Sequence, residues 1–358
     1  MRFGIYTEIQ TARGKNHAEA IWDVMAQIEH ADRAGFDCYS LVDHHFSPEF
    51  SLSPNPLAMF TAAAQRTSKI RFRVALLTLP LENPLRLAGQ VAEADILTNG
   101  RLECGLGRGH AWLYEPCNVP LEESRPRYDD SIEILLRAWT HERVSFSGQC
   151  YEIKNVEVVP KPLQKPHPPI FTGGTSDATY RLAGERGWGI FVPPLLPFKV
   201  LKRPLTIYKE ACAQHSYKPN IVYIRPVYLG NDDSQIRREA ETALHNFLEF
   251  AAAPNESLHS EEKKAELLAK GFGFYASGAL ESVAKLTFEE IIDQEIAFIG
   301  TPQKVINQIK NLTEMEEIAE LAILSNFGGI EHWKAMKTQE IFSKSIIPAF
   351  AKRPRRYG

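Results

Sequence analysis

An acid and two imidazoles follow a short apolar run, residues 38–42, as Asp43, His44 and His45. A buried strand with an ionisable tip is typical of a cleft at a sheet edge, because charges are costly inside a core and useful at its rim. Imidazole takes up and releases protons near neutral pH, which suits acid–base catalysis. Neighbouring side chains of an extended segment point to opposite faces, so we expect one histidine at most to face a given pocket and the other to be structural.

A second group of residues favours an anion. Gly173, Gly174, Thr175 and Ser176 end an apolar run just before a predicted helix, and Thr179 lies in its first turn. Glycines allow a backbone to approach a ligand closely, and the amides and hydroxyls at a helix start bind phosphate. The same turn would equally serve as a simple helix cap.

Two arginines extend this second group. Arg108, in the glycine-rich segment 105–109, and Arg125 would offer fixed, paired N–H donors to the same phosphate. Arg108 would equally be a structural ion-pair partner, and both interpretations stay open at this point.

These side chains need a scaffold that gathers strand ends at one rim. Apolar strand-like runs alternate with amphipathic segments, which is typical of a parallel sheet with crossover helices. The predicted fold is therefore an α/β protein, an eight-stranded (β/α)8 TIM barrel, with a doubly wound open sheet as the alternative. The eight strands are predicted at residues 2–8, 38–45, 70–78, 102–107, 170–172, 189–192, 221–229 and 321–324.

Helices are predicted between these strands. Two stretches break the alternation and are expected to be insertions in a single domain that spans residues 1–358: a hairpin and a proline-rich segment near 143–168, and a mixed helical segment near 254–299. One helix begins at Thr301, and the closing helix is predicted at 339–352. The remaining helices are predicted at residues 17–35, 55–67, 84–98, 127–139, 177–186, 199–215 and 234–251.

Composition narrows the class of protein. The 358 residues carry a formal charge of −3, which gives no reason to expect nucleic acid or an anionic membrane as a partner. No apolar stretch approaches the roughly 20 residues of a membrane span. The five cysteines show no CxxC spacing, and no metal-ligand motif is present, so we expect a cytoplasmic protein without a metal. The basic residues at 352–356 are interpreted as a solvated end.

Taken together, the motifs resemble those of the bacterial luciferase-like superfamily of flavin-dependent monooxygenases. The resemblance implies a (β/α)8 barrel, reduced FMN (FMNH2) as cofactor, O2 as co-substrate, and oxygen activation as a peroxide at the flavin C4a carbon. It covers nearly the whole chain and rests on Gly35-Phe36-Asp37, Val42 to Phe46, Leu79-Pro80, Asn83-Pro84, Gly100-Arg101, Gly173 to Ser176 and Gly300-Thr301-Pro302.

The resemblance also implies roles for particular residues. His44 matches an active-site histidine that assists proton transfer to or from the flavin peroxide. Ala75 and Leu76 match an unusual non-proline cis peptide beneath the flavin ring. The remaining implied cofactor contacts surround the flavin phosphate and are Arg108, Arg125, Gly174, Thr175, Ser176 and Thr179.

Two departures from the luciferase pattern are visible. Asp43 stands where luciferases carry glutamate, which leaves the role of this carboxylate open. Gly107 stands where light-emitting members carry a reactive cysteine, so we do not expect bioluminescence. The 254–299 insertion, with its aromatic residues Phe272, Phe274 and Tyr275, is expected to form a lid over flavin and substrate.

The leading hypothesis is a two-component monooxygenase that receives FMNH2 from a separate NAD(P)H-dependent flavin reductase and oxidises a small organic substrate. The alternatives are a hydride-transferring oxidoreductase that uses the deazaflavin F420 and a flavin-binding protein without turnover. Small residues at 58 and 62–64 suggest a homodimer of the family type, although burial within one subunit would explain them as well. The sequence does not identify the substrate.

Overall fold

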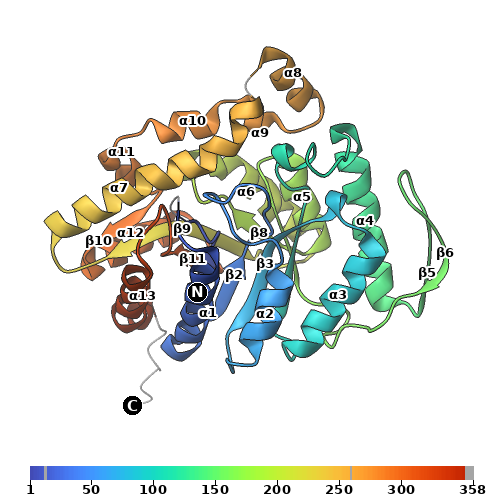
Figure 1. Ribbon diagram of the computed structural model, residues 1–358, viewed down its shortest axis with the longest axis horizontal. Helices are drawn as coiled ribbons and strands as arrows, with labels where there is room; N and C mark the ends of the chain where they lie inside the picture. Colours follow the sequence, from blue (N-terminus) through green and yellow to red (C-terminus); the bar gives the residue numbers. More distant parts are fainter. Residues whose placement is uncertain (12–13, 259, 351–358) are drawn as a thin grey trace.

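Eight parallel strands form a closed barrel in the structure, a computed structural model that describes residues 1–11, 14–258 and 260–350. Each strand pairs with the next along the chain, and pairing of the last strand with the first closes the ring. The predicted (β/α)8 TIM barrel is confirmed and the open sheet is excluded (Figure 1). The barrel strands are β1 (Arg2–Thr7), β2 (Cys38–Leu41), β3 (Arg71–Thr78), β4 (Leu102–Gly107), β7 (Ile170–Gly173), β8 (Gly189–Val192), β9 (Ile221–Leu229) and β11 (Glu320–Leu324).

Helices cover the outside of this barrel (Figure 1). The helix after β1 is capped at its start by Asn16, whose side chain accepts a hydrogen bond from the Ala18 amide. It is capped at its end by Gly35, whose φ of 84° few other residues adopt. The apolar faces of the helices pack on the barrel strands, for example on β9, which is buried along its whole length. The helices are α1 (His17–Ala34), α2 (Pro56–Ala64), α3 (Pro84–Leu97), α4 (Ser124–Thr140), α5 (Asp177–Arg186), α6 (Phe198–Gln214), α7 (Asp233–Ala252), α12 (Pro302–Met315) and α13 (His332–Ile341).

Two segments stand outside the alternation. The first is an antiparallel hairpin of β5 (Arg143–Ser147) and β6 (Glu152–Glu157), which projects beside α4 and precedes the proline-rich segment (Figure 1). The second runs from η4 (Ala253–Leu258) through four short helices, of which α10 lies along α7 and α8 stands beyond the end of α7 (Figure 1). These four are α8 (Glu261–Ala269), α9 (Gly273–Ala276), α10 (Ala279–Ala284) and α11 (Phe288–Asp293).

The structure corrects three predicted boundaries. The second strand ends at Leu41 rather than at residue 45, so both histidines lie in the loop that follows. An additional short strand, β10 (Phe298–Gly300), pairs with β9 inside the stretch predicted as mixed helix. The closing helical region begins at His332 and continues through a π-helical turn to Phe350, while its predicted end and the basic tail lie outside the described residues.

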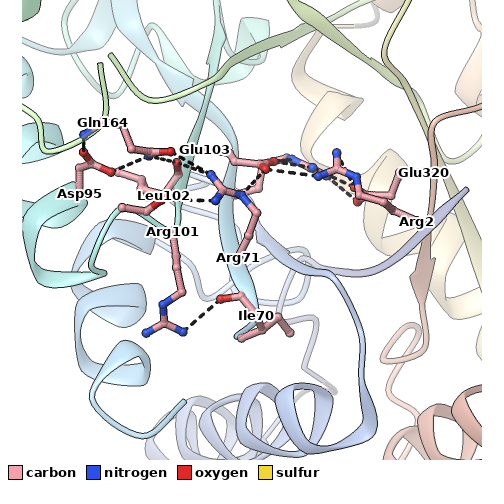
Figure 2. A network of polar contacts seen from close by, with 11 residues as sticks. Arg2, Ile70, Arg71, Asp95, Arg101, Leu102, Glu103, Gln164 and Glu320 are labelled. Carbon is pink, nitrogen blue, oxygen red and sulfur yellow. Dashed lines mark hydrogen bonds and ion pairs between the residues drawn. The ribbon is translucent and has the colours of Figure 1, made fainter. Parts of the chain in front are cut away.

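A network of five charged side chains occupies the end of the barrel where the strands begin (Figure 2). Fully buried Arg73 donates to Glu320 at 2.6 and 2.9 Å and to Glu103 at 2.7 Å. Arg71 donates to Glu103 at 2.6 Å, and Arg2 lies 3.0 Å from Glu320. Burial alone would raise the pKa of Glu103, but the three arginines override it and hold this pKa at about 2. The network therefore joins β1, β3, β4 and β11 at the end of the barrel opposite the carboxyl ends of the strands.

In the part of the chain that the structure describes, no helix is long and apolar enough to cross a membrane. All five cysteines are free.

Candidate active site

A cavity of about 280 Å³ opens at the carboxyl ends of the barrel strands. Strand ends, the loop after β2 and the inner side of the α8–α9 segment all contribute to its wall. Every residue predicted for the site lines this cavity, namely His44, Ala75, Leu76, Arg108, Arg125, Gly174, Thr175, Ser176 and Thr179. Residues from five separate parts of the sequence are thus brought around one cavity.

His44 is buried against Phe50, with the two rings stacked 5.0 Å apart. Its Nδ1 lies 2.7 Å from the backbone carbonyl oxygen of Asp43. A carbonyl only accepts hydrogen bonds, so Nδ1 carries the proton of the neutral ring. Burial lowers the pKa of His44 to about 4, against the opposing effects of the Asp43 carbonyl and carboxylate, and the ring is therefore neutral at pH 7.

Hydrogen bonds connect His44 to His110 and His110 to Tyr275. Nε2 of His110 lies 3.0 Å from Nε2 of His44, and Nδ1 of His110 lies 2.6 Å from the Tyr275 hydroxyl. Because Nε2 of neutral His44 bears no proton, His110 must donate with its own Nε2–H and accept at Nδ1 from Tyr275. Burial lowers the pKa of His110 well below its usual value, so this ring is neutral too.

Neither His110 nor Tyr275 was proposed as a site residue from the sequence. His110 directly follows the glycine-rich segment after β4, so its position at the rim was a usable signal. Tyr275 was named only among the aromatic residues of the expected lid, and its contact with His110 had no signal in the sequence because the two residues lie 165 positions apart.

Asp43 connects two strand ends. Its carboxylate accepts the Thr78 amide at 3.1 Å and lies 3.1 Å from Nε2 of His45. The hydrogen bond to Asp43 raises the pKa of His45, which is half-buried and does not line the cavity. The structure therefore gives the open question of Asp43 a structural answer, and only one of the two adjacent histidines faces the cavity.

The peptide bond between Ala75 and Leu76 is cis, as the resemblance implied. It lies where the pairing of β3 with β4 shifts register between Val74 and Leu77. A Cβ at Gly107 would lie 2.6 Å from a methyl carbon of Leu76, so a side chain fits there only if Leu76 moves. This packing is a physical reason why residue 107 is a glycine and not a residue with a side chain.

The hydroxyls of Ser176 and Thr179 lie side by side at the start of α5, 2.9 Å apart. The Ser176 side chain caps the helix by accepting the Thr179 amide at 3.3 Å. The cap and the anion seat considered from the sequence thus coincide in one turn. Gly174 has a φ of 154°, a backbone conformation that favours glycine. The turn therefore carries no side chain at this position, directly before exposed Thr175.

The two arginines differ in what they contact. Arg125 pairs with Asp129 at 2.8 Å in a partly exposed position. Arg108 donates to the carbonyl oxygens of Lys270 and Gly271 at 3.2 and 2.6 Å, and its guanidinium lies 4.2 Å from the centre of the Phe272 ring. Arg108 is therefore no ion-pair partner among the described residues, but a link between the barrel rim and the α8–α9 segment.

Glu8 is a cavity residue that sequence reasoning missed. It follows β1, is only 4% exposed, and accepts hydrogen bonds from the Tyr6 hydroxyl at 2.9 Å and from Gln10 at 3.1 Å. No described lysine or arginine pairs with it. Burial raises the pKa of Glu8 to about 7 against these two hydrogen bonds. Its place at the end of the first predicted strand was a signal that could have been used.

Within residues 1–11, 14–258 and 260–350, no group of three or more His, Cys, Asp or Glu side chains is placed to hold a metal ion. The parallel barrel, its rim cavity and the two buried, neutral histidines define a (β/α)8 barrel enzyme. The description of the luciferase-like monooxygenase family matches residues 1–316, and the chain belongs to that family. The resemblance is thereby confirmed, and the protein is an oxidoreductase.

Named relatives cover most of the chain. It is 27% identical over 348 residues to the FMNH(2)-dependent dimethylsulfone monooxygenase of Pseudomonas putida, covering 91% of this chain and 88% of the relative. It is 25% identical over 256 residues to the oxygenase component of the flavin-dependent trigonelline monooxygenase of Acinetobacter baylyi, covering 69% and 71%. The crystal structure of the monooxygenase RslO1 from Streptomyces bottropensis superposes with a TM-score of 0.83 at 24% identity, covering 98% and 100%.

Relatives that use another cofactor also match. An F420-dependent glucose-6-phosphate dehydrogenase of Segniliparus rotundus is 30% identical over 167 residues, which is 44% of this chain and 49% of the relative. Family membership therefore leaves open the choice between FMN and F420.

Proposed function

We propose that the protein is the oxygenase of a two-component flavin-dependent monooxygenase. It would receive FMNH2 from a separate NAD(P)H-dependent flavin reductase and use O2 to oxidise a small organic substrate. The observation that carries this proposal is the single cavity that joins an anion seat, the Ala75–Leu76 bond and buried, neutral His44. The names of the two relatives, one an oxygenase component and one FMNH2-dependent, support it.

The residues present fit FMN. The phosphate would lie at the start of α5, held by the hydroxyls of Ser176 and Thr179 and by the backbone at Gly174 and Thr175, where no side chain of Gly174 obstructs it. Arg108 and Arg125 line the same cavity and would neutralise the charge of the phosphate. The flavin ring would then reach Ala75 and Leu76. Bound FMNH2 supplies the two electrons with which O2 is activated.

The remaining wall has two tasks. Apolar side chains exclude water, which strengthens electrostatic interactions inside the cavity and protects reactive species. His44 takes part in proton transfer, because a neutral imidazole can accept a proton and return it. The organic substrate would occupy the end away from the anion seat, near Tyr6, Glu8 and Phe50.

F420-dependent hydride transfer is the second candidate, and the F420-dependent relative is the observation that favours it. F420 has a longer, polyanionic tail and would favour a more basic rim. The lysine and arginine residues that line this cavity are Arg108 and Arg125, and both already contact acceptors of the chain, namely two carbonyl oxygens and Asp129. The described rim therefore fits the shorter FMN better.

Rapid mixing tests the proposal. Photoreduced FMN bound to the protein is mixed with oxygenated buffer, and we expect a transient absorbance distinct from that of oxidised FMN. His44→Ala should change the lifetime of this transient at least tenfold with FMN affinity within twofold of wild type. If FMNH2 oxidises in the same way with and without the protein, the proposed monooxygenase activity is wrong. A titration with F420 then separates the dehydrogenase from a flavin-binding protein without turnover.

The assembly and its location are part of the same proposal. Of the small residues of α2, Ala63 and Ala64 are buried within the subunit, whereas Ala58 and Ala62 are exposed. The exposed pair fits a family-type homodimer, and static light scattering measures the oligomeric state directly. Five free cysteines fit a reducing cytoplasm.

A further inference from the structure

Three side chains in the cavity wall form a hydrogen-bond chain that runs in one direction. Tyr275 donates to His110, His110 donates to His44, and His44 donates to the Asp43 carbonyl, over 2.6, 3.0 and 2.7 Å. Both nitrogens of His44 are engaged within the chain. Neutral His44 therefore presents no free nitrogen to a molecule in the cavity.

The open end of this chain is the Tyr275 hydroxyl. Tyr275 lines the cavity, and its oxygen, which donates its proton to His110, has lone pairs that accept no hydrogen bond from the described residues. Burial raises the pKa of Tyr275, so a phenolate is not stored there. A proton that arrives at this oxygen must therefore pass on to the histidines.

We propose that Tyr275 exchanges one proton with the molecule bound in the cavity, and that His110 and His44 carry and store that proton. This inference rests on the proposed function for its chemistry, although the chain itself does not. The group that fits is an O–H or N–H of the bound molecule that can donate to the Tyr275 oxygen.

The step balances without an oxidant. The O–H or N–H bond of the bound molecule breaks and its proton joins the Tyr275 oxygen. The former Tyr275 proton moves to Nδ1 of His110, and the former Nε2 proton of His110 moves to Nε2 of His44. Tyr275 and His110 end neutral, His110 with its proton on the other nitrogen, and His44 ends as an imidazolium. The reverse sequence returns the proton.

The charged surroundings set where the proton rests. His44 faces the carbonyl and carboxylate of Asp43, which favour the imidazolium, while His45 and burial oppose it. Arg108 and Tyr114 face Tyr275 from the rim and from the loop after β4. A stored proton is therefore stabilised at the Asp43 end, and it is readily returned because burial disfavours the charge.

The first arm of the test uses the cofactor-free protein, with long-range proton–nitrogen NMR of ¹⁵N-labelled histidine. Wild type should show His44 protonated at Nδ1 and His110 at Nε2. Tyr275→Phe should shift both nitrogen signals of His110. The matched control is Tyr114→Phe, which removes a hydroxyl bonded to the Arg108 carbonyl in the same apolar cluster and should leave both histidines unchanged. His44 protonated at Nε2 in wild type, or unchanged His110 signals in Tyr275→Phe, overturns the proposal.

The second arm uses FMNH2 and O2 as probes, with no organic substrate. Tyr275→Phe should slow the proton-dependent decay of the transient at least tenfold and alter its solvent deuterium isotope effect and pH profile, with FMN affinity within twofold of wild type. An unchanged rate, isotope effect and profile overturn the proposal. If wild type shows no transient at all, the proposed function fails, and the histidine tautomers of the first arm decide this inference alone.

Discussion

At the scale of single residues, Glu8 lies in an environment that disfavours its charge. It is almost wholly buried, and its partners are the neutral groups of Tyr6 and Gln10. Because its pKa in the folded protein, about 7, lies above its ordinary value of 4.5, folding favours the protonated form. The contribution of Glu8 to the free energy of unfolding is therefore highest below about pH 4.5 and falls as pH rises towards 7.

Glu8→Gln removes this titration while keeping the shape of the side chain. The shift corresponds to about 3 kcal/mol. We expect the variant to resemble wild type in stability near pH 4.5 and to be about 3 kcal/mol more stable at pH 8, as measured by urea denaturation at the two pH values. Exposed Glu93→Gln is the control and should change stability little at either pH. An equal effect of Glu8→Gln at both pH values would contradict the assignment.

At the scale of elements, polar contacts from two residues of the loop after β4 hold the α8–α9 segment: His110 bonds with Tyr275, and Arg108 makes the larger set of contacts. Arg108 contacts two backbone carbonyls and the Phe272 ring within three consecutive residues of the segment. A guanidinium can make these contacts together because its donors form a rigid planar fork. A lysine ammonium at the same position keeps the charge and loses the fork.

Arg108→Lys should therefore loosen the segment. Two lost hydrogen bonds correspond to about 1–3 kcal/mol, so we expect cleavage between residues 260 and 276 by a native-state protease to become about tenfold faster. Arg125→Lys is the matched control, because Arg125 lines the same anion seat but pairs with Asp129 of its own helix. It should weaken FMN binding without changing the cleavage rate, and equal cleavage of the two variants would refute the link.

At the scale of the whole molecule, one end of the barrel holds the buried charge network that supports stability, and the other end holds the cavity. The buried charges of Arg73, Glu103 and Glu320 hold the end where the strands begin, and the cavity lies at the other. Breaking one member of a buried charge cluster is costly because it leaves its partners uncompensated. Stability and ligand binding should consequently respond to different substitutions.

Glu103→Gln should lower the free energy of unfolding at pH 7 by about 3–5 kcal/mol and leave FMN affinity unchanged. The folded pKa of Glu103, about 2, lies below its ordinary value, so its contribution is complete above about pH 4.5 and is lost as pH falls towards 2. The difference between wild type and variant in chemical denaturation should therefore shrink from pH 7 to pH 3. Exposed Glu152→Gln of the hairpin serves as the control. A constant difference would show that Glu103 is not the titrating group.

The barrel was predictable because its signal is local and repeated. Strands such as 189–192 and 321–324 are continuous apolar runs, and the ends of the second, fourth and fifth predicted strands place His44, Arg108 and Ser176 at one rim. The second strand was predicted too long because apolar Val42 continues the run after pairing has stopped at Leu41. The three residues of β10 are too few to show a period.

The hydrogen bonds of the site, in contrast, could not be predicted from the sequence. The His44–His110 and His110–Tyr275 contacts join residues 66 and 165 positions apart, and each depends on how loops fold over the rim. The resemblance supplied His44 but no partner for it. The contacts of Arg108 with a carbonyl at residue 271 likewise leave no trace in residue type, because every residue has a carbonyl.

The hydrogen bond from His44 to the Asp43 carbonyl also limits the stoichiometry of the site. A carbonyl oxygen in the backbone cannot pass a proton on, so the chain has a single entrance and its far end is closed. Its capacity is one proton, since a second would leave two adjacent buried rings both charged. A reaction cycle that consumes two protons must accordingly obtain the second from water at the mouth of the cavity.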